Sequence, residues 1–395
     1  MSLIADSAQL AEFCARIASA DFITVDTEFM RERTYWPQLC LVQIGGPDEA
    51  AAIDPLAEGM DLSPLFRLLE DERILKVFHA ARQDIEIFFN LTGRVPNPLF
   101  DTQVAAMVCG FGDSVSYETL AAQLAGTRID KSVRFTDWSA RPLTDRQIDY
   151  AMADVTHLRK IYVALAKRLK SGDRAHWLHE EMMTLLDPAT YRLDPEEAWR
   201  RLKPRTPKPR LLMVLREVAA WREREAQRRD IPRNRLIRDE MVMDIAAHAP
   251  RTVDELARLR GLSKSLAEGR MGQDILAAVE RGLALPESEA PTLPPPVDLP
   301  GGLGPVVELL KVLLKMKCER QQVAPKLIAS TSDLERIAAD DNAPVPALQG
   351  WRRELFGEDA LALKHGRLAL AMRGKRVVLM PVDRSAEPAP SLKRA

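Results

Sequence analysis

The chain has little of what holds disulfide-rich or zinc-binding proteins together, and nothing that resembles a membrane anchor. Its 395 residues include only four cysteines, scattered and without a CxxC pair, so neither a disulfide framework nor a zinc site is indicated. No apolar run approaches the ~20 residues that a membrane helix needs. The first ten residues lack the basic start and apolar stretch of a signal peptide. We therefore expect a cytoplasmic protein without a membrane partner.

Charge is unevenly distributed along a chain whose formal net charge is only −1. Residues 1–160 contain 24 acidic and 15 basic side chains, whereas residues 200–238 contain 14 basic and 4 acidic ones. This asymmetry suggests that one part of the chain binds cations and another binds a polyanion.

The first part of the chain alternates strand and helix signals. Apolar, β-rich runs predict strands, and helical periodicity separates them. Thr144 and Gln147 form a capping box ahead of a long amphipathic helix. Together these signals predict an α/β domain with a mixed sheet. The predicted strands are 22–25, 39–44, 50–53 and 74–78, and the main helices are 7–20, 62–69, 80–91 and 144–169.

From about residue 175 onward, helical signals dominate. An amphipathic helix is predicted at 211–229, and Thr252 with Glu255 forms a second capping box. A proline-rich segment then predicts a stiff linker before a second helical block. The expected organisation is an α/β domain at 1–175, a connecting segment at 176–209, a helical domain at 210–283, a linker at 284–302, a second helical domain at 303–376, and a disordered tail at 377–395.

Two acidic residues at the end of the first strand indicate a metal site. Asp26 and Glu28 are two positions apart, so their side chains point the same way from a strand. When two carboxylates lie so close together, ionising both costs free energy through charge repulsion unless a cation is present. Magnesium and manganese prefer such hard oxygen ligands.

Further acidic residues occur at suitable places in the same domain. Asp84 lies early in the helix that follows the 74–78 strand, and Tyr150 and Asp154 share one face of the 144–169 helix. Taken singly, each acid is more often a turn, cap or surface residue than a metal ligand. The hypothesis depends on all of them occurring in order within one α/β domain.

The same residues carry a resemblance to the ribonuclease D family. Asp26-Thr-Glu-Phe29 resembles the first exonuclease motif, Val77-Phe-His-Ala-Ala-Arg-Gln-Asp84 the second, and Tyr150-Ala-Met-Ala-Asp154 the third. Residues 210–283 and, more loosely, 304–376 resemble the helical HRDC domains shared by RecQ-type helicases and ribonuclease D. The resemblance implies a ribonuclease H-like exonuclease domain with a mixed sheet, followed by two all-α domains.

The resemblance also implies an activity and roles for the residues. It implies a metal-dependent 3′→5′ exoribonuclease that binds two divalent cations, Mg²⁺ or Mn²⁺, and acts on RNA with a free 3′ end, such as tRNA precursors. Asp26 would bridge the ions, Glu28 and Asp154 would hold the one that activates water, and Asp84 would bind the other. Tyr150 would position the attacking water.

Contacts to RNA are harder to assign from sequence. Tyr35 could stack on a base or belong to the core, and His79 could touch substrate or bind a backbone carbonyl. Arg222, Arg229 and Arg233 belong to the basic region, which fits phosphate binding or a solvated helix face. A DNA 3′→5′ exonuclease and a non-catalytic RNA-binding scaffold remain alternatives, and we expect a monomer.

Overall fold

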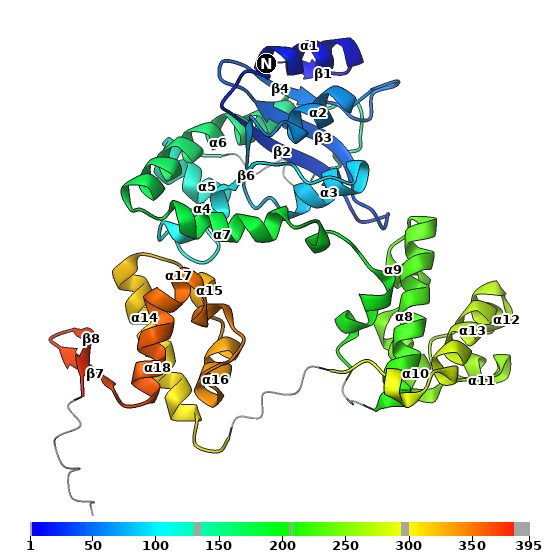
Figure 1. The fold of residues 1–395 in the computed structure, drawn as a ribbon. Helices are drawn as coiled ribbons and strands as arrows, with labels where there is room; N and C mark the ends of the chain where they lie inside the picture. Colours follow the sequence, from blue (N-terminus) through cyan, green and yellow to red (C-terminus); the bar gives the residue numbers. More distant parts are fainter. Residues whose placement is uncertain (1, 130–135, 205, 207, 294–299, 383–395) are drawn as a thin grey trace, which may run out of the picture. The chain divides into compact units, whose positions relative to one another are not determined.

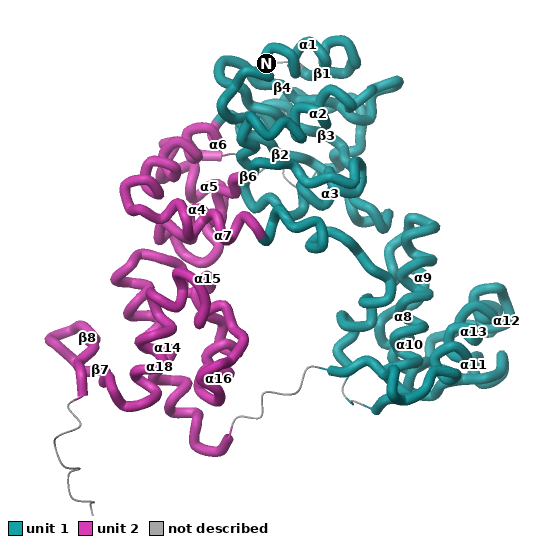
Figure 2. The backbone as a smooth tube through the Cα atoms, viewed as in Figure 1, with its two compact units in different colours: residues 1–99, 130–156, 184–294 teal, residues 100–129, 157–183, 295–395 magenta. Residues whose placement is uncertain are grey.

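The computed structural model describes residues 2–129, 136–204, 206, 208–293 and 300–382. The chain divides into two compact units (Figure 2). The first comprises residues 1–99, 130–156 and 184–294, and the second comprises residues 100–129, 157–183 and 295–395. Within the described residues, no helix is both long and apolar enough to span a membrane.

A six-stranded mixed sheet forms the centre of the N-terminal domain (Figure 1). Its order is β1-β4-β3-β2-β5-β6. β3 is antiparallel to both β2 and β4, whereas β1 is parallel to β4 and β2 is parallel to β5. The predicted α/β class with a mixed sheet is therefore confirmed. The strands are β1 (Ser2–Ile4), β2 (Phe22–Met30), β3 (Gln38–Gly45), β4 (Ala50–Ile53), β5 (Leu75–Phe78) and β6 (Leu99–Asp101).

β2 is longer than the predicted strand, and this determines where its acidic residues lie. It pairs with β5 only through Phe22–Thr24, but it continues along β3 as far as Met30. Asp26 and Glu28 therefore lie within the strand, beyond the last residue that pairs with β5. The sequence pattern ended the strand too early because acidic residues interrupt its apolar run.

The helices of this domain start largely where local signals place them. The capping box is confirmed, since the Thr144 N–H donates to Gln147 Oε1 (3.0 Å) and the Gln147 N–H donates to Thr144 Oγ1 (3.3 Å). The helices are α1 (Ser7–Ile17), α2 (Ser63–Glu70), α3 (Arg82–Thr92), α4 (Thr102–Val108), α5 (Tyr117–Leu120) with a π-turn at Ala121–Ala125, α6 (Asp145–Ser171) and α7 (Ala175–Leu186).

The first unit also contains the first helical domain. Its core includes the buried side chains of Trp199, Leu215 and Ile275. At Gly282 an added Cβ would lie 2.7 Å from the Val214 Cα, so this glycine allows α13 and α8 to pack closely. The elements are a 3₁₀ helix (Pro195–Leu202), α8 (Pro209–Arg229), α9 (Arg233–Leu236), α10 (Asp239–His248), α11 (Val253–Ala257), α12 (Lys264–Glu268) and α13 (Arg270–Ala284).

The second helical domain belongs to the second unit and ends in a β-hairpin (Figure 1). The second domain was expected to be helical as far as residue 376 and the chain to be disordered from residue 377. Both expectations were wrong, because residues 368–381 form this hairpin. The two strands are short and turn at Gly374 (φ 62°), so their sequence pattern was too weak to predict a hairpin. Residues 383–395 lie outside the described part. The elements are α14 (Gly304–Gln321), α15 (Pro325–Ile328), α16 (Thr331–Ala339), α17 (Gly350–Arg352), a π-turn (Arg353–Gly357), α18 (Glu358–Lys364), β7 (Leu368–Arg373) and β8 (Arg376–Pro381).

Candidate active site

Three of the four predicted carboxylates converge. One oxygen from each of Asp26, Glu28 and Asp154 lies within 4.8 Å of the others. Asp26 and Glu28 reach the same face of β2 because strand side chains alternate. Asp154 comes from α6, so residues about 130 positions apart in sequence meet at one point.

α6 is fixed to β2 immediately beside this cluster. The Thr24 hydroxyl, on the same face of β2 as Asp26, donates to the Val155 carbonyl (2.8 Å). Gly45 of β3 leaves room for the helix, since a Cβ there would lie 3.2 Å from the same carbonyl oxygen. A threonine and a glycine, neither of them among the predicted site residues, therefore set the position of Asp154.

The electrostatics of the cluster favour a cation. Burial, and then the neighbouring charge of Asp154, raise the pKa of Asp26 well above its ordinary value, although a hydrogen bond from the Thr27 backbone opposes them. Ionising all three groups is therefore unfavourable unless positive charge is present. A set of close carboxylate oxygens fits a hard divalent ion.

The fourth predicted carboxylate, Asp84, is not one of the three converging groups. It occupies the first turn of α3 and is buried, and its Oδ1 accepts a hydrogen bond from the Thr27 hydroxyl. Thr27 lies between Asp26 and Glu28 in sequence. Ala80, in the turn that leads into α3, has a φ of 57°, a conformation that costs free energy for a residue with a Cβ. This turn directs the start of α3 so that Asp84 reaches β2.

Tyr150 lies one helical turn before Asp154 on α6. Its ring is half-buried and lies 6.2 Å, centroid to centroid, from the buried ring of Trp138. Both rings pack on a cluster that includes Cys40, Leu41 and Met152. The phenol is therefore held by its ring on the face of α6 that also carries Asp154.

Gln43 is a further polar residue that sequence reasoning missed. It pairs directly with Asp26 across β2 and β3, so its side chain lies on the same face of the sheet. The side chain is fully buried, and neither of its amide atoms has a hydrogen-bond partner among the residues that the structure describes. The only available signal was a glutamine within an otherwise apolar strand.

The residues predicted to contact RNA have mostly structural partners. Tyr35 is 5% exposed and its hydroxyl donates to Glu223, so its ring offers no face to a base. Arg222 is 3% exposed and donates to the Ile237 carbonyl (3.0 Å). These two side chains belong to the core, and we withdraw them from the RNA-binding set.

The other three predicted contacts are more accessible. Arg229 pairs with Glu225 on the surface of α8. Arg233 pairs with Glu223 and remains 30% exposed. His79 is half-buried just beyond β5, in the turn that leads into α3. Their contacts to RNA stay predictions.

An α/β domain with clustered carboxylates, joined to helical domains, defines a class of 3′→5′ exonucleases. The family profile described as a 3′-5′ exonuclease matches residues 1–170, and that of the HRDC domain matches residues 212–279. The chain is 57% identical to a ribonuclease D of Nitrobacter hamburgensis over 378 residues, which are 96% of this chain and 99% of that protein. It is 53% identical to a ribonuclease D of Granulibacter bethesdensis over 96% of both chains.

A solved structure agrees with these relatives. The crystal structure of Escherichia coli RNase D superposes with a TM-score of 0.80 at 33% identity, covering 92% of this chain and 98% of that one. The chain belongs to the ribonuclease D family. It is a hydrolase, a 3′→5′ exoribonuclease.

Proposed function

We propose that Asp26, Glu28, Asp84 and Asp154 hold two divalent ions, Mg²⁺ or Mn²⁺, for the stepwise hydrolysis of RNA from its 3′ end. The observation that carries this proposal is the convergence of Asp26, Glu28 and Asp154 from β2 and α6. When bound, the ions supply Lewis acidity, which lowers the pKa of the attacking water and offsets charge on the departing 3′ oxygen.

The reaction adds water to the last phosphodiester. The water oxygen bonds to phosphorus, the bond from phosphorus to the 3′ oxygen breaks, and the proton given up by water is balanced by the one that the 3′ oxygen gains. The products are a nucleoside 5′-monophosphate and an RNA shorter by one residue with a new 3′ hydroxyl.

The chain's own groups orient the reactants. Asp26, which has an oxygen within 4.8 Å of one from Glu28 and one from Asp154, would be a ligand of both ions. Asp84, on α3, would help to hold the second ion through water. The Tyr150 hydroxyl orients the attacking water, because a phenol with an ordinary pKa of about 10 is a poor base at neutral pH.

Structured RNA with a single-stranded 3′ end, such as a tRNA precursor, is the proposed substrate. The solved E. coli relative is described as an exoribonuclease involved in structured RNA processing. The basic region at 200–238 supports recognition of the phosphate backbone and of RNA shape. We further propose that the protein acts as a monomer in the cytoplasm.

Digestion of a 3′-extended tRNA precursor tests this proposal. With Mg²⁺ or Mn²⁺ the extension should be removed one residue at a time, and EDTA or Asp154→Asn should stop the reaction. A matched DNA strand should be degraded more slowly, and equal rates would favour the DNA exonuclease alternative. Metal-independent binding without turnover would favour the scaffold alternative.

A further inference from the structure

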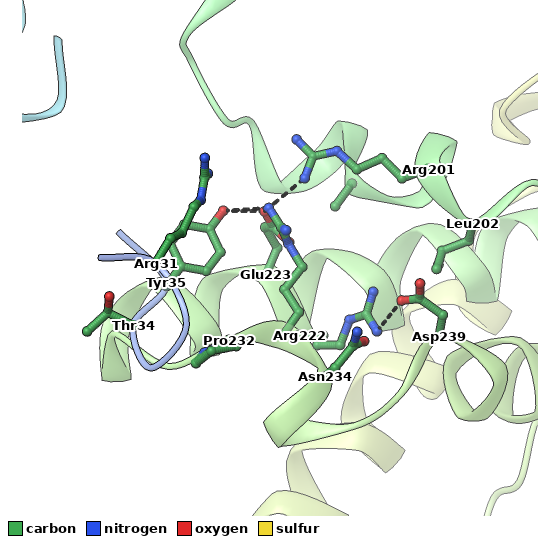
Figure 3. Close-up of a pocket in the computed structure, with 12 residues that line it drawn as sticks. Arg31, Thr34, Tyr35, Arg201, Leu202, Arg222, Glu223, Pro232, Asn234 and Asp239 are labelled. Carbon is green, nitrogen blue, oxygen red and sulfur yellow. Dashed lines mark hydrogen bonds and ion pairs between the residues drawn. The ribbon is translucent and has the colours of Figure 1, made fainter. Parts of the chain in front are cut away.

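Two adjoining pockets in the first unit share three arginines. One, of about 330 Å³, lies between the loop after β2 and the first helical domain (Figure 3). The other, of about 180 Å³, shares Arg31, Arg201 and Arg233 and adds Arg82 and Glu86. We call Arg31, Arg82, Arg201 and Arg233, together with the two pockets, the arginine pocket. The buried Arg222, which also lines the first pocket, is paired there with Asp239.

The carboxylates of the arginine pocket do not balance its guanidinium groups. Glu86 forms two hydrogen bonds with Arg31, and Glu223 forms two with Arg233. Arg201 lies 3.8 Å from Glu223, which Arg233 already engages, and its side chain is 52% exposed. Arg82 is exposed and has no hydrogen bond or ion pair among the described residues. The pocket therefore carries a surplus of about two positive charges.

Part of the arginine pocket is rigid and part is available to a ligand. The Arg233 guanidinium lies 4.9 Å above the Tyr35 ring and donates to its hydroxyl (3.1 Å). Figure 3 shows the Tyr35 hydroxyl and Arg201 both directed at Glu223. These contacts fix one wall, while Arg82 and Arg201 remain free to turn toward an anion. Planar guanidinium groups match the oxygen geometry of a phosphate.

The position of the arginine pocket links it to the carboxylate cluster. Arg31 follows β2 and is three residues beyond Glu28, so their Cα atoms are at most about 10 Å apart at the strand rise of about 3.3 Å per residue. Arg82 and Asp84 occupy the same first turn of α3. A 3′ exonuclease takes the terminal nucleotide into its active site, so the rest of the strand leaves on the 5′ side.

We propose that the arginine pocket binds phosphodiester groups of the RNA strand on the 5′ side of the scissile bond. This proposal rests on the proposed function, because it places the 3′ end at the carboxylate cluster. The pocket recognises the backbone and not the bases. It makes affinity depend on strand length, since a dinucleoside monophosphate has no phosphodiester on the 5′ side of the scissile bond.

The test is RNA binding by fluorescence anisotropy in EDTA, where no turnover occurs. The variant Arg82→Gln/Arg201→Gln should bind a ten-residue strand about tenfold more weakly at 0.15 M salt. Its slope of log affinity against log salt should fall by about 1.4, since each phosphate contact to a single strand contributes about 0.7. Arg82→Lys/Arg201→Lys, which keeps both charges, should retain most of the slope.

Arg73→Gln is the matched control, because Arg73 is an exposed arginine of the same domain outside the arginine pocket. If the double variant behaves like this control, the proposal is overturned. It is also overturned if affinity for a nucleoside 5′-monophosphate falls as much as affinity for the strand, because the pocket would then hold product. Absence of turnover with intact length-dependent binding would instead refute the proposed function and leave the pocket supported.

Discussion

Replacing Gly45 with alanine should displace α6 and so lower catalytic activity, in addition to lowering the stability of the protein. A Cβ at this position would overlap the Thr24 hydroxyl and lie 3.2 Å from the Val155 carbonyl oxygen. Thr24 must then give up its hydrogen bond to Val155, or α6 must move outward. Asp154 adjoins Val155, so either response displaces a carboxylate of the cluster.

The size of the effect follows from these contacts. Overpacking a tight interior typically costs about 1–3 kcal/mol, and losing a buried hydrogen bond adds about 1 kcal/mol. We therefore expect the free energy of unfolding to fall by about 2–4 kcal/mol. A displacement near 1 Å at a reacting centre lowers the rate by about a hundredfold, so kcat should fall by that order while KM changes little.

Gly46→Ala provides a matched control one residue further along. There a Cβ would lie 2.7 Å from Ile17 Cγ2, so the strain falls on α1 and not on α6. Both variants should lose stability in urea or thermal unfolding, but only Gly45→Ala should lose kcat in single-turnover cleavage of a short RNA. The reasoning fails if Gly45→Ala keeps wild-type kcat, or if Gly46→Ala loses as much.

Other substitutions test the remaining parts of the site. Asp26→Asn should lower activity about a thousandfold or more, since a lost metal ligand removes several kcal/mol of transition-state stabilisation. In EDTA it should nevertheless raise the melting temperature at pH 8. The pKa of Asp26 is raised in the folded protein, so this carboxyl costs stability once the pH exceeds the ordinary pKa of an aspartate, and the gain should vanish as the pH falls to that ordinary value. For the same reason Mn²⁺ should raise the wild-type melting temperature more at pH 8 than at pH 5.5, and an equal rise would count against proton–metal competition. Tyr35→Phe should cost about 1–3 kcal/mol in urea unfolding, because Glu223 loses a buried hydrogen bond. Gln43→Met should leave the melting temperature in EDTA unchanged or higher, since the buried amide has no partner in the described part of the chain; a clear loss would show that a partner exists.

Local sequence signals were sufficient for much of the exonuclease domain. The capping box of Thr144 and Gln147 fixed the start of α6, and helical spacing placed Tyr150 one turn from Asp154. Strand alternation placed Asp26 and Glu28 on one face of β2. These predictions succeeded because each depends on residues only a few positions apart.

The rest depends on contacts between distant residues. The bond from Thr27 to Asp84 and the packing of Gly45 against Val155 join elements that no periodicity relates. Tyr35 looked suited to stacking on a base, but its hydroxyl and ring are used by Glu223 and Arg233 from the helical domain. A surface and a core aromatic residue have the same local sequence pattern, so only the fold distinguishes them.

The most direct test is calorimetric titration of Mn²⁺ into the wild-type protein and Asp154→Asn at pH 7.5. We predict that the wild type binds the ion and that the variant, folded to the same degree by circular dichroism, binds it at least tenfold more weakly. Equal affinity in the two proteins would contradict the view that carboxylates from β2 and α6 jointly hold the ion.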